Sequence, residues 1–125
     1  MYRTFLSLAA AAAMLGVAAG AFGAHGLRAV LSEADLATYR TAVEYQMWHA
    51  LGLGLVAFAV DRSPGQRLLV WAGWLMAAGI LLFSGSLYLL AISHIRWLGF
   101  ITPFGGLAFL AAWILLLSGV RRFDR

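Results

Sequence analysis

Cysteine and lysine are absent from this chain of 125 residues, proline occurs twice, and charged residues make up only 11% of it. Without cysteine there is no disulfide, no thiol nucleophile and no thiolate ligand for a metal. Soluble domains contain about 25% charged residues, so the composition excludes an ordinary soluble protein. The length predicts a single domain, residues 1–125.

Hydrophobic residues make up 63% of the chain and gather in four runs. The runs cover about residues 4–24, 41–60, 68–91 and 98–120. Because the hydrocarbon core of a bilayer is about 30 Å thick, a helix of about 20 apolar residues crosses it. The sequence therefore predicts an all-α, polytopic membrane protein built as a four-helix transmembrane bundle.

Capping residues set the expected helix boundaries. Ser32 is a typical N-cap, and the acidic residues after it suit the first turn of a helix. Ser63 is followed by Pro64 and, three positions after the cap, by a glutamine, which predicts a capping box. Thr102 precedes a proline in the same way, so the fourth helix begins or bends there. The expected helices span about residues 4–24, 33–60, 64–92 and 98–120.

The basic residues predict the orientation in the membrane. All nine are arginines, and they lie near the ends of the apolar runs. If both termini are cytoplasmic, the inside holds Arg3, Arg62, Arg67, Arg121, Arg122 and Arg125, and the outside holds Arg28, Arg40 and Arg96. Because cytoplasmic loops are enriched in positive residues, this distribution favours an N-in/C-in topology.

Small residues recur at three- or four-residue spacing along the first run. They are Ala9, Ala13, Gly16, Gly20 and Ala24. Such a stripe lets helix backbones approach closely, which is how transmembrane helices associate. We expect Gly16 and Gly20 to be helix-packing residues. Packing inside the bundle is the favoured interpretation, and self-association of two chains is the alternative.

Polar side chains at membrane depth fall in the expected outer half of the bundle. They are His25, Glu44, His49, Ser84, Tyr88 and Thr102. Placing an ionisable group in hydrocarbon costs free energy, so such residues are retained where they pair with another group or take part in function. One interpretation is a connected cluster around His49 that fixes the helices through hydrogen bonds. The other is a small polar cavity, open to the outside, in which a carboxylate and an imidazole exchange protons.

No metal, cofactor or catalytic residue is predicted. Three histidines and Glu44 are a conceivable ligand set for a metal or haem, yet no HxxxH or HExxH spacing occurs. Ser84 and Ser86 lie inside an apolar run, where serines commonly bond to a backbone carbonyl. The sequence therefore does not predict an enzyme.

Four phrases in order carry a resemblance to a known family. They are residues 20–27 (GAFGAHGL), 45–51 (YQMWHAL), 83–89 (FSGSLYL) and 102–106 (TPFGG). Together they resemble the YgdD/YwdK-like family of small bacterial inner-membrane proteins catalogued as domain of unknown function 423, which is related to transmembrane protein 256. The resemblance implies four helices and a multi-pass location in the plasma membrane. It implies no reaction and assigns no catalytic role to any residue.

The expected function is that of a small integral plasma-membrane protein with a non-enzymatic role, structural, interacting or lipid-associated. Its outer-side polar cluster would fix the helices or hold a small ligand or lipid headgroup. Expected partners are membrane lipids and either a second copy of the chain or other membrane proteins, but not nucleic acid. The alternative is a small transporter or channel that uses Glu44 and His49 as a proton-coupled site.

Overall fold

The computed structural model describes residues 1–123, so Arg125, one of the six arginines expected on the cytoplasmic side, lies outside the described residues. All regular elements of the described chain are helical. In order they are α1 (Tyr2–Phe22), the π-helical turn η1 (Gly23–Leu27), α2 (Glu33–Arg62), α3 (Arg67–Gly79), the π-helical turn η2 (Ile80–Ser84), α4 (Gly85–Ser93), the 3-10 helix η3 (Arg96–Phe100) and α5 (Thr102–Val120).

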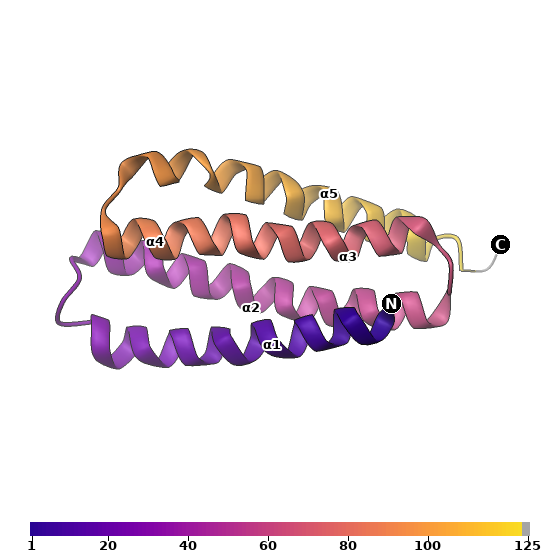
Figure 1. The fold of residues 1–125 in the computed structure, drawn as a ribbon, viewed down its shortest axis with the longest axis horizontal. Helices are drawn as coiled ribbons and strands as arrows, with labels where there is room; N and C mark the ends of the chain where they lie inside the picture. Colours follow the sequence, from indigo (N-terminus) through magenta and orange to yellow (C-terminus); the bar gives the residue numbers. More distant parts are fainter. Residues whose placement is uncertain (124–125) are drawn as a thin grey trace.

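These elements form four long rods that lie side by side (Figure 1). The turn η1 prolongs α1, and η2 joins α3 to α4 without a break. The N-terminus, the turn between α2 and α3, and the end of α5 lie at one end of the bundle, which we call the Ser63 end. The connections from η1 to α2 and from α4 to α5 lie at the other end, which we call the Ser32 end.

The rod α2 is central to the packing. It packs along α1 on one side and along α3, η2 and α4 on another, whereas α5 packs mainly against α3 and η2. Three rods are long and apolar enough to cross a membrane, namely Tyr2–Leu27, Arg67–Ser93 and Arg96–Val120. The fourth, α2, has 30 residues and carries charges towards both ends. The four-helix bundle expected from the sequence is confirmed.

Helix boundaries differ from the expected ones at two starts. Ser63 is the C-cap of α2 rather than the N-cap of the next helix, and Gly65 adopts a φ of +85° in the turn that follows. Helix α3 therefore begins at Arg67, three residues after the expected start. At the other start, α5 begins at Thr102, where the threonine and proline predict a start or a bend, and not at residue 98, because Arg96–Phe100 form the separate helix η3. The Thr102 hydroxyl bonds to another helix instead of capping its own.

The pattern of apolar residues in the sequence does not predict the two π-helical turns. A π turn holds one more residue than an α turn, so it rotates the side chains that follow it. In η2 this places Ser84 against α2 while Phe83 lies against α5. Adjacent residues of this rod therefore contact different neighbours.

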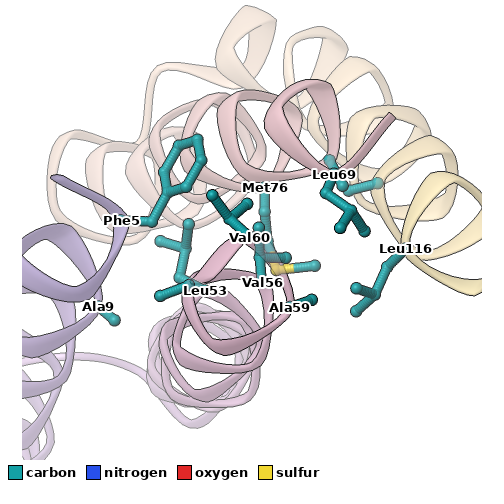
Figure 2. Close-up of a cluster of buried hydrophobic side chains, with 12 residues drawn as sticks. Phe5, Ala9, Leu53, Val56, Ala59, Val60, Leu69, Met76 and Leu116 are labelled. Carbon is teal, nitrogen blue, oxygen red and sulfur yellow. The ribbon is translucent and has the colours of Figure 1, made fainter. Parts of the chain in front are cut away.

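A cluster of buried apolar side chains fills the Ser63 half of the bundle (Figure 2). It contains Phe5 of α1, Leu53 and Val56 of α2, and Leu69 and Met76 of α3, each at most 1% exposed. Figure 2 shows Phe5 reaching from α1 towards the other rods. Because lipid tails are as apolar as these side chains, the cluster stabilises the bundle through close packing rather than through the hydrophobic effect.

The small residues of α1 face α2. A Cβ added at Gly16 would overlap the Met47 side chain, and one added at Gly20 would lie 3.3 Å from a methyl carbon of Val43. Both glycines therefore sit in the α1–α2 contact within one chain. The closest backbone approach lies elsewhere, where a Cβ added at Gly105 of α5 would overlap the backbone nitrogen of Phe83.

We expect Gly105→Ala to lower the free energy of unfolding by about 1–3 kcal/mol, because the new methyl group must push α5 away from the backbone of η2. The matched control is Gly54→Ala in α2, where no atom lies within 4 Å of an added Cβ. That variant should be neutral or up to about 1 kcal/mol more stable, since alanine favours helix over glycine. Thermal unfolding in detergent measures both, and equal effects would contradict the close approach at Gly105.

Candidate functional site

Gln46 joins three helices through hydrogen bonds. Its amide nitrogen donates to the carbonyl oxygen of Ala12 in α1 at 2.8 Å, and its amide oxygen accepts from the Tyr88 hydroxyl of α4 at 2.6 Å. The side chain is 6% exposed. A lone amide in the middle of apolar helices has no water to bond, so both of its ends are held by protein.

Two further side chains bond to backbone carbonyls of neighbouring helices. The Tyr39 hydroxyl of α2 donates to the carbonyl of Ala19 in α1 at 2.6 Å. The Ser84 hydroxyl of η2 donates to the carbonyl of Ala42 in α2 at 2.7 Å. The Tyr39 and Tyr88 rings also meet edge to face at 5.1 Å. These contacts pin α1 and α4 to the Ser32 half of α2.

His49 bonds to its own helix and to α5. Its Nδ1 lies 2.7 Å from the carbonyl oxygen of Tyr45, so Nδ1 carries the proton and donates it. Its Nε2 therefore accepts, and the indole N–H of Trp113 donates to it at 3.0 Å. The imidazole also stacks on the Phe109 ring at 3.4 Å between centroids. The imidazole is neutral in this arrangement, and both of its nitrogens are used.

A third polar contact joins α4 to α5. The Ser86 hydroxyl donates to the carbonyl of Phe83 at 3.0 Å and lies 2.6 Å from the Thr102 hydroxyl. Since the single Ser86 proton goes to the carbonyl, Thr102 is the donor to Ser86. This contact fixes the start of α5 against α4.

The single cluster expected around His49 is corrected by these contacts. Ser84 and Tyr88 bond to other groups of α2, Thr102 bonds to Ser86, and none of them bonds to His49. His25, in η1, and Glu44, on α2, are exposed and join none of the contacts above. The polar groups are therefore separate interhelical contacts, because helix rotation aims them at different neighbours.

Gln46 and Trp113 are the important residues that the sequence interpretation missed. Gln46 is the only side-chain amide inside the four apolar runs, and that isolation was a usable signal. Trp113 gave no signal, because a tryptophan in a membrane helix is ordinary and only the structure places its N–H against an imidazole.

A groove about 510 Å³ in volume separates α1 from the rod of α3, η2 and α4, and we call it the α1–α4 groove. Its lining is almost wholly apolar and consists of Leu8, Ala11, Ala12, Leu15 and Ala19 of α1, Gln46 and Leu53 of α2, and Ala77, Ile80, Leu81, Ser84, Gly85 and Tyr88 of the third rod. Its polar members are already hydrogen-bonded within the protein. The groove offers an apolar ligand surface without a free polar group.

Packed side chains join the first rod to its neighbours beyond both ends of the α1–α4 groove. At the Ser63 end, Phe5 lies against Gly73 and meets the Trp74 ring edge to face at 5.3 Å. At the Ser32 end, Tyr39 and Tyr88 pack together in a buried cluster that also contains Leu27, Leu36 and Ala91. Of the groove-lining residues, Leu15 of α1 and Leu81 of η2 are 58% and 76% exposed, so the groove opens sideways towards the medium around the bundle.

A second hollow of about 660 Å³ lies between α2 and α5. It is lined by Tyr45, His49, Phe83, Pro103, Gly106, Leu107, Phe109, Leu110 and Trp113. Aromatic rings that already pack against one another at tilted angles form much of it, with ring centroids 4.5 Å apart for Tyr45 and Phe83 and 5.5 Å apart for Phe83 and Phe109. Its imidazole has no free nitrogen for a ligand.

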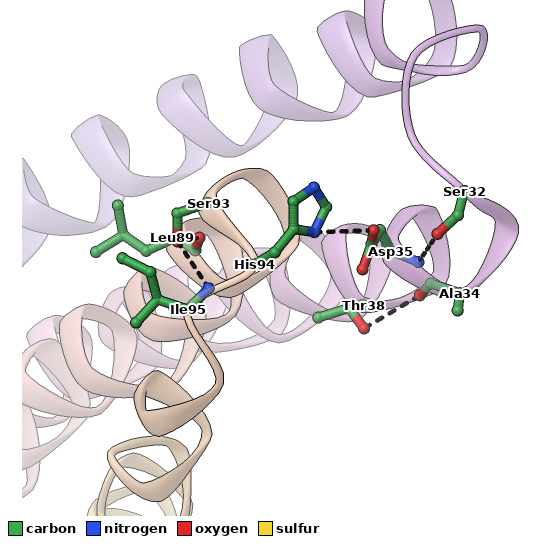
Figure 3. A network of polar contacts seen from close by, with 8 residues as sticks. All are labelled: Ser32, Ala34, Asp35, Thr38, Leu89, Ser93, His94 and Ile95. Carbon is green, nitrogen blue, oxygen red and sulfur yellow. Dashed lines mark hydrogen bonds and ion pairs between the residues drawn. The ribbon is translucent and has the colours of Figure 1, made fainter.

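The Ser32 end carries the one ion pair of the described residues (Figure 3). Nδ1 of His94 lies 3.2 Å from a carboxylate oxygen of Asp35, which stands in the first turn of α2. His94 ends α4 in the left-handed conformation, with a φ of 60°, and the Ser32 hydroxyl caps α2 by accepting from the Asp35 N–H at 3.1 Å. Within residues 1–123, no three histidine or acidic side chains gather as a metal site.

We expect Gln46→Leu to lower the free energy of unfolding by about 1–2 kcal/mol, because it removes two interhelical hydrogen bonds. Tyr88→Phe should then cost less in the Gln46→Leu background than in the wild type, since their shared bond is already gone. Ser86→Ala is the control, because Ser86 shares no partner with Gln46 and should add independently. Additive effects of the Gln46 and Tyr88 variants would contradict the network.

Comparison with known proteins places this architecture in a family. A family model described as a protein of unknown function (DUF423) matches residues 19–106. The chain is 50% identical to the UPF0382 membrane protein YwdK of Bacillus subtilis, covering 97% of this chain and 98% of the relative. It is 42% identical to the UPF0382 inner membrane protein YgdD of Escherichia coli K12, covering 98% and 93%. No solved structure matches. The chain belongs to the DUF423 family of membrane proteins, whose function is unknown.

Proposed function

We propose that this protein is a non-enzymatic, lipid-associated protein of the plasma membrane, and that the α1–α4 groove holds a hydrocarbon chain of a membrane lipid. The observation that carries the proposal is the groove itself, which has an almost wholly apolar lining and opens sideways between exposed residues of α1 and η2. At about 510 Å³ its volume falls in the range of ligand pockets, which is about 300–1,000 Å³.

The surroundings of the groove favour a lipid chain as its occupant. Apolar cavities do not hold ordered water, which needs two to four polar partners. Gln46, Ser84 and Tyr88 already use their polar atoms on protein, so a polar substrate would find no group to bind. In a bilayer, the medium next to a sideways opening is hydrocarbon, and a flexible acyl chain can enter without losing any hydrogen bond.

The geometry favours this role over proton-coupled transport. A transport site at membrane depth needs ionisable groups that face the bundle interior or a water-filled cavity. Glu44 is exposed on the outside of α2 and lines neither groove. His49 is neutral, with both nitrogens bonded.

We also propose that the chain crosses the membrane four times with both termini in the cytoplasm. The support is the distribution of arginines in the described residues. Arg3, Arg62, Arg67, Arg121 and Arg122 belong to segments at the Ser63 end, and Arg28, Arg40 and Arg96 belong to segments at the Ser32 end. Positive residues concentrate on the cytoplasmic side, so the Ser63 end is assigned to the cytoplasm.

Gly85→Leu tests the lipid site. Gly85 lines the α1–α4 groove, and no atom lies within 4 Å of an added Cβ, so a leucine side chain there starts in open space and takes up volume in the groove. We expect the wild type, purified in mild detergent, to retain a lipid in native mass spectrometry and Gly85→Leu to lose it. A phospholipid with a photoreactive group in mid-chain should crosslink to α1 residues of the groove in the wild type and not in Gly85→Leu.

Gly54→Leu is the matched control for Gly85→Leu. Gly54 is also a helical glycine with open space around an added Cβ, but it does not line the groove. It should retain lipid and crosslink as the wild type does. Equal lipid retention by the two folded leucine variants would refute the groove as a lipid site.

Cysteine labelling tests the topology, because the chain has no native cysteine. We expect a membrane-impermeant thiol reagent to label Ser32→Cys in intact cells and to label Ser63→Cys only after the membrane is opened. Labelling in the reverse order would place the Ser63 end outside the cell and overturn the proposed orientation.

A further inference from the structure

One face of α2 has no neighbour within the described chain. Its exposed residues form a stripe along the helix, which we call the α2 stripe, and they are Arg40, Glu44, Trp48, Leu51, Leu55 and Phe58. The apolar members are 54–65% exposed. Apolar side chains on such a face need no explanation in a bilayer, but the carboxylate of Glu44 does.

Glu44 has no charged partner within the described residues and stands near the expected outer edge of the hydrocarbon core. It stands 17 residues before Asp61, which marks the Ser63 end of α2, so the two are separated by about 26 Å along the helix at 1.5 Å per residue. The hydrocarbon core is about 30 Å thick, so Glu44 falls within it when Asp61 lies at the opposite surface. The one ion pair of residues 1–123 joins His94 and Asp35, so the Glu44 carboxylate is unpaired there.

The spacing of the α2 stripe suits contact with another helix. From Glu44 to Phe58 the members follow one another at steps of four, three, four and three residues. This is the seven-residue repeat with which two helices pack along each other at a small angle. The same spacing places the large side chains Trp48, Leu51 and Leu55 in one continuous seam.

We propose that a second copy of this chain covers the α2 stripe, and that Arg40 of each copy pairs with Glu44 of the partner subunit. The stripe carries one positive and one negative group, so it is complementary to itself across a two-fold axis. Copies inserted in the same orientation place their α2 helices parallel. Each Arg40 then lies one helical turn from the level of the opposing carboxylate, within the span of its long side chain, and two ion pairs form per dimer.

Pairing within one helix explains the stripe less well. Arg40 and Glu44 are four residues apart, yet no ion pair joins them in the structure. Their order, with the basic residue nearer the N-terminus, is also the less favourable one for a pair at this spacing. A partner subunit supplies both the opposite charge and the apolar surface that the rest of the stripe matches.

Charge reversal with mixing tests the proposal. Donor-labelled and acceptor-labelled copies are reconstituted in lipid vesicles, and energy transfer reports the dimer. We expect Arg40→Glu alone and Glu44→Arg alone each to lower the association constant about tenfold or more, because like charges face each other. Mixing the two variants should restore the wild-type signal, because one chain then carries only carboxylates and the other only guanidinium groups at these positions.

Two results would overturn the dimer. One is energy transfer in the wild type no higher than random encounters give. The other is a pair of folded variants that mixing does not restore, which is the result expected if Arg40 and Glu44 pair only within one helix. Glu33→Arg is the control, because Glu33 is exposed at the start of α2, outside the α2 stripe, and its reversal should leave the dimer unchanged.

Disulfide crosslinking tests the proposed dimer without the charge variants, and it therefore applies even if those variants do not fold. Leu51→Cys lies in the middle of the α2 stripe and should form a covalent dimer on oxidation in membranes. Ile114→Cys is the control, because Ile114 of α5 is 62% exposed on another rod. Equal crosslinking at the two positions, or none at Leu51→Cys, would overturn the proposal.

Discussion

The absence of water at membrane depth is the constraint on which this structure depends. A polar side chain in hydrocarbon must bond to protein, because the surrounding medium offers neither donor nor acceptor. Gln46 meets this requirement by bonding to α1 and α4 at once. The same requirement explains why Tyr39, Ser84 and His49 bond to carbonyls or to an indole N–H. A few buried polar groups therefore fix how apolar helices, which would otherwise slide past one another, are oriented.

The way in which α1 contacts the other rods also accounts for the α1–α4 groove. The rod α1 is held along α2 by small residues and by hydrogen bonds. Phe5 of α1 contacts the third rod directly near the Ser63 end, whereas near the Ser32 end Tyr39 of α2 lies between Ala19 of α1 and Tyr88 of α4. Between these contacts three of the five groove-lining positions of α1 are alanines, namely Ala11, Ala12 and Ala19. The small residues that permit close packing on one face of α1 thus leave open space on the neighbouring face.

Much of the fold follows from the sequence, because apolar runs of membrane length and arginines at their ends are strong signals. The start of α3 does not, since Ser63, Pro64 and Gly65 suit the end of one helix as well as the start of the next. The π turn η2 does not either, because one extra residue in an all-apolar stretch leaves the pattern unchanged. His49 and Ser84 are buried as the sequence predicts, whereas His25 and Glu44 are exposed. The hydrogen-bond partners could not be predicted, because rotation of each helix decides which neighbour His49 or Tyr88 meets.

The central position of α2 has a consequence for the order of assembly. The bundle consists of two helical hairpins in sequence, α1 with α2 and then the α3–η2–α4 rod with α5. During synthesis the first hairpin can form while the rest of the chain is still being made, and the amide nitrogen of Gln46 can bond to Ala12 at that stage. The amide oxygen stays unpaired until Tyr88 arrives with the second hairpin. The first hairpin therefore carries an unpaired amide oxygen, and Tyr88 of the second hairpin supplies its donor. This hydrogen bond favours docking of the second hairpin in the native register.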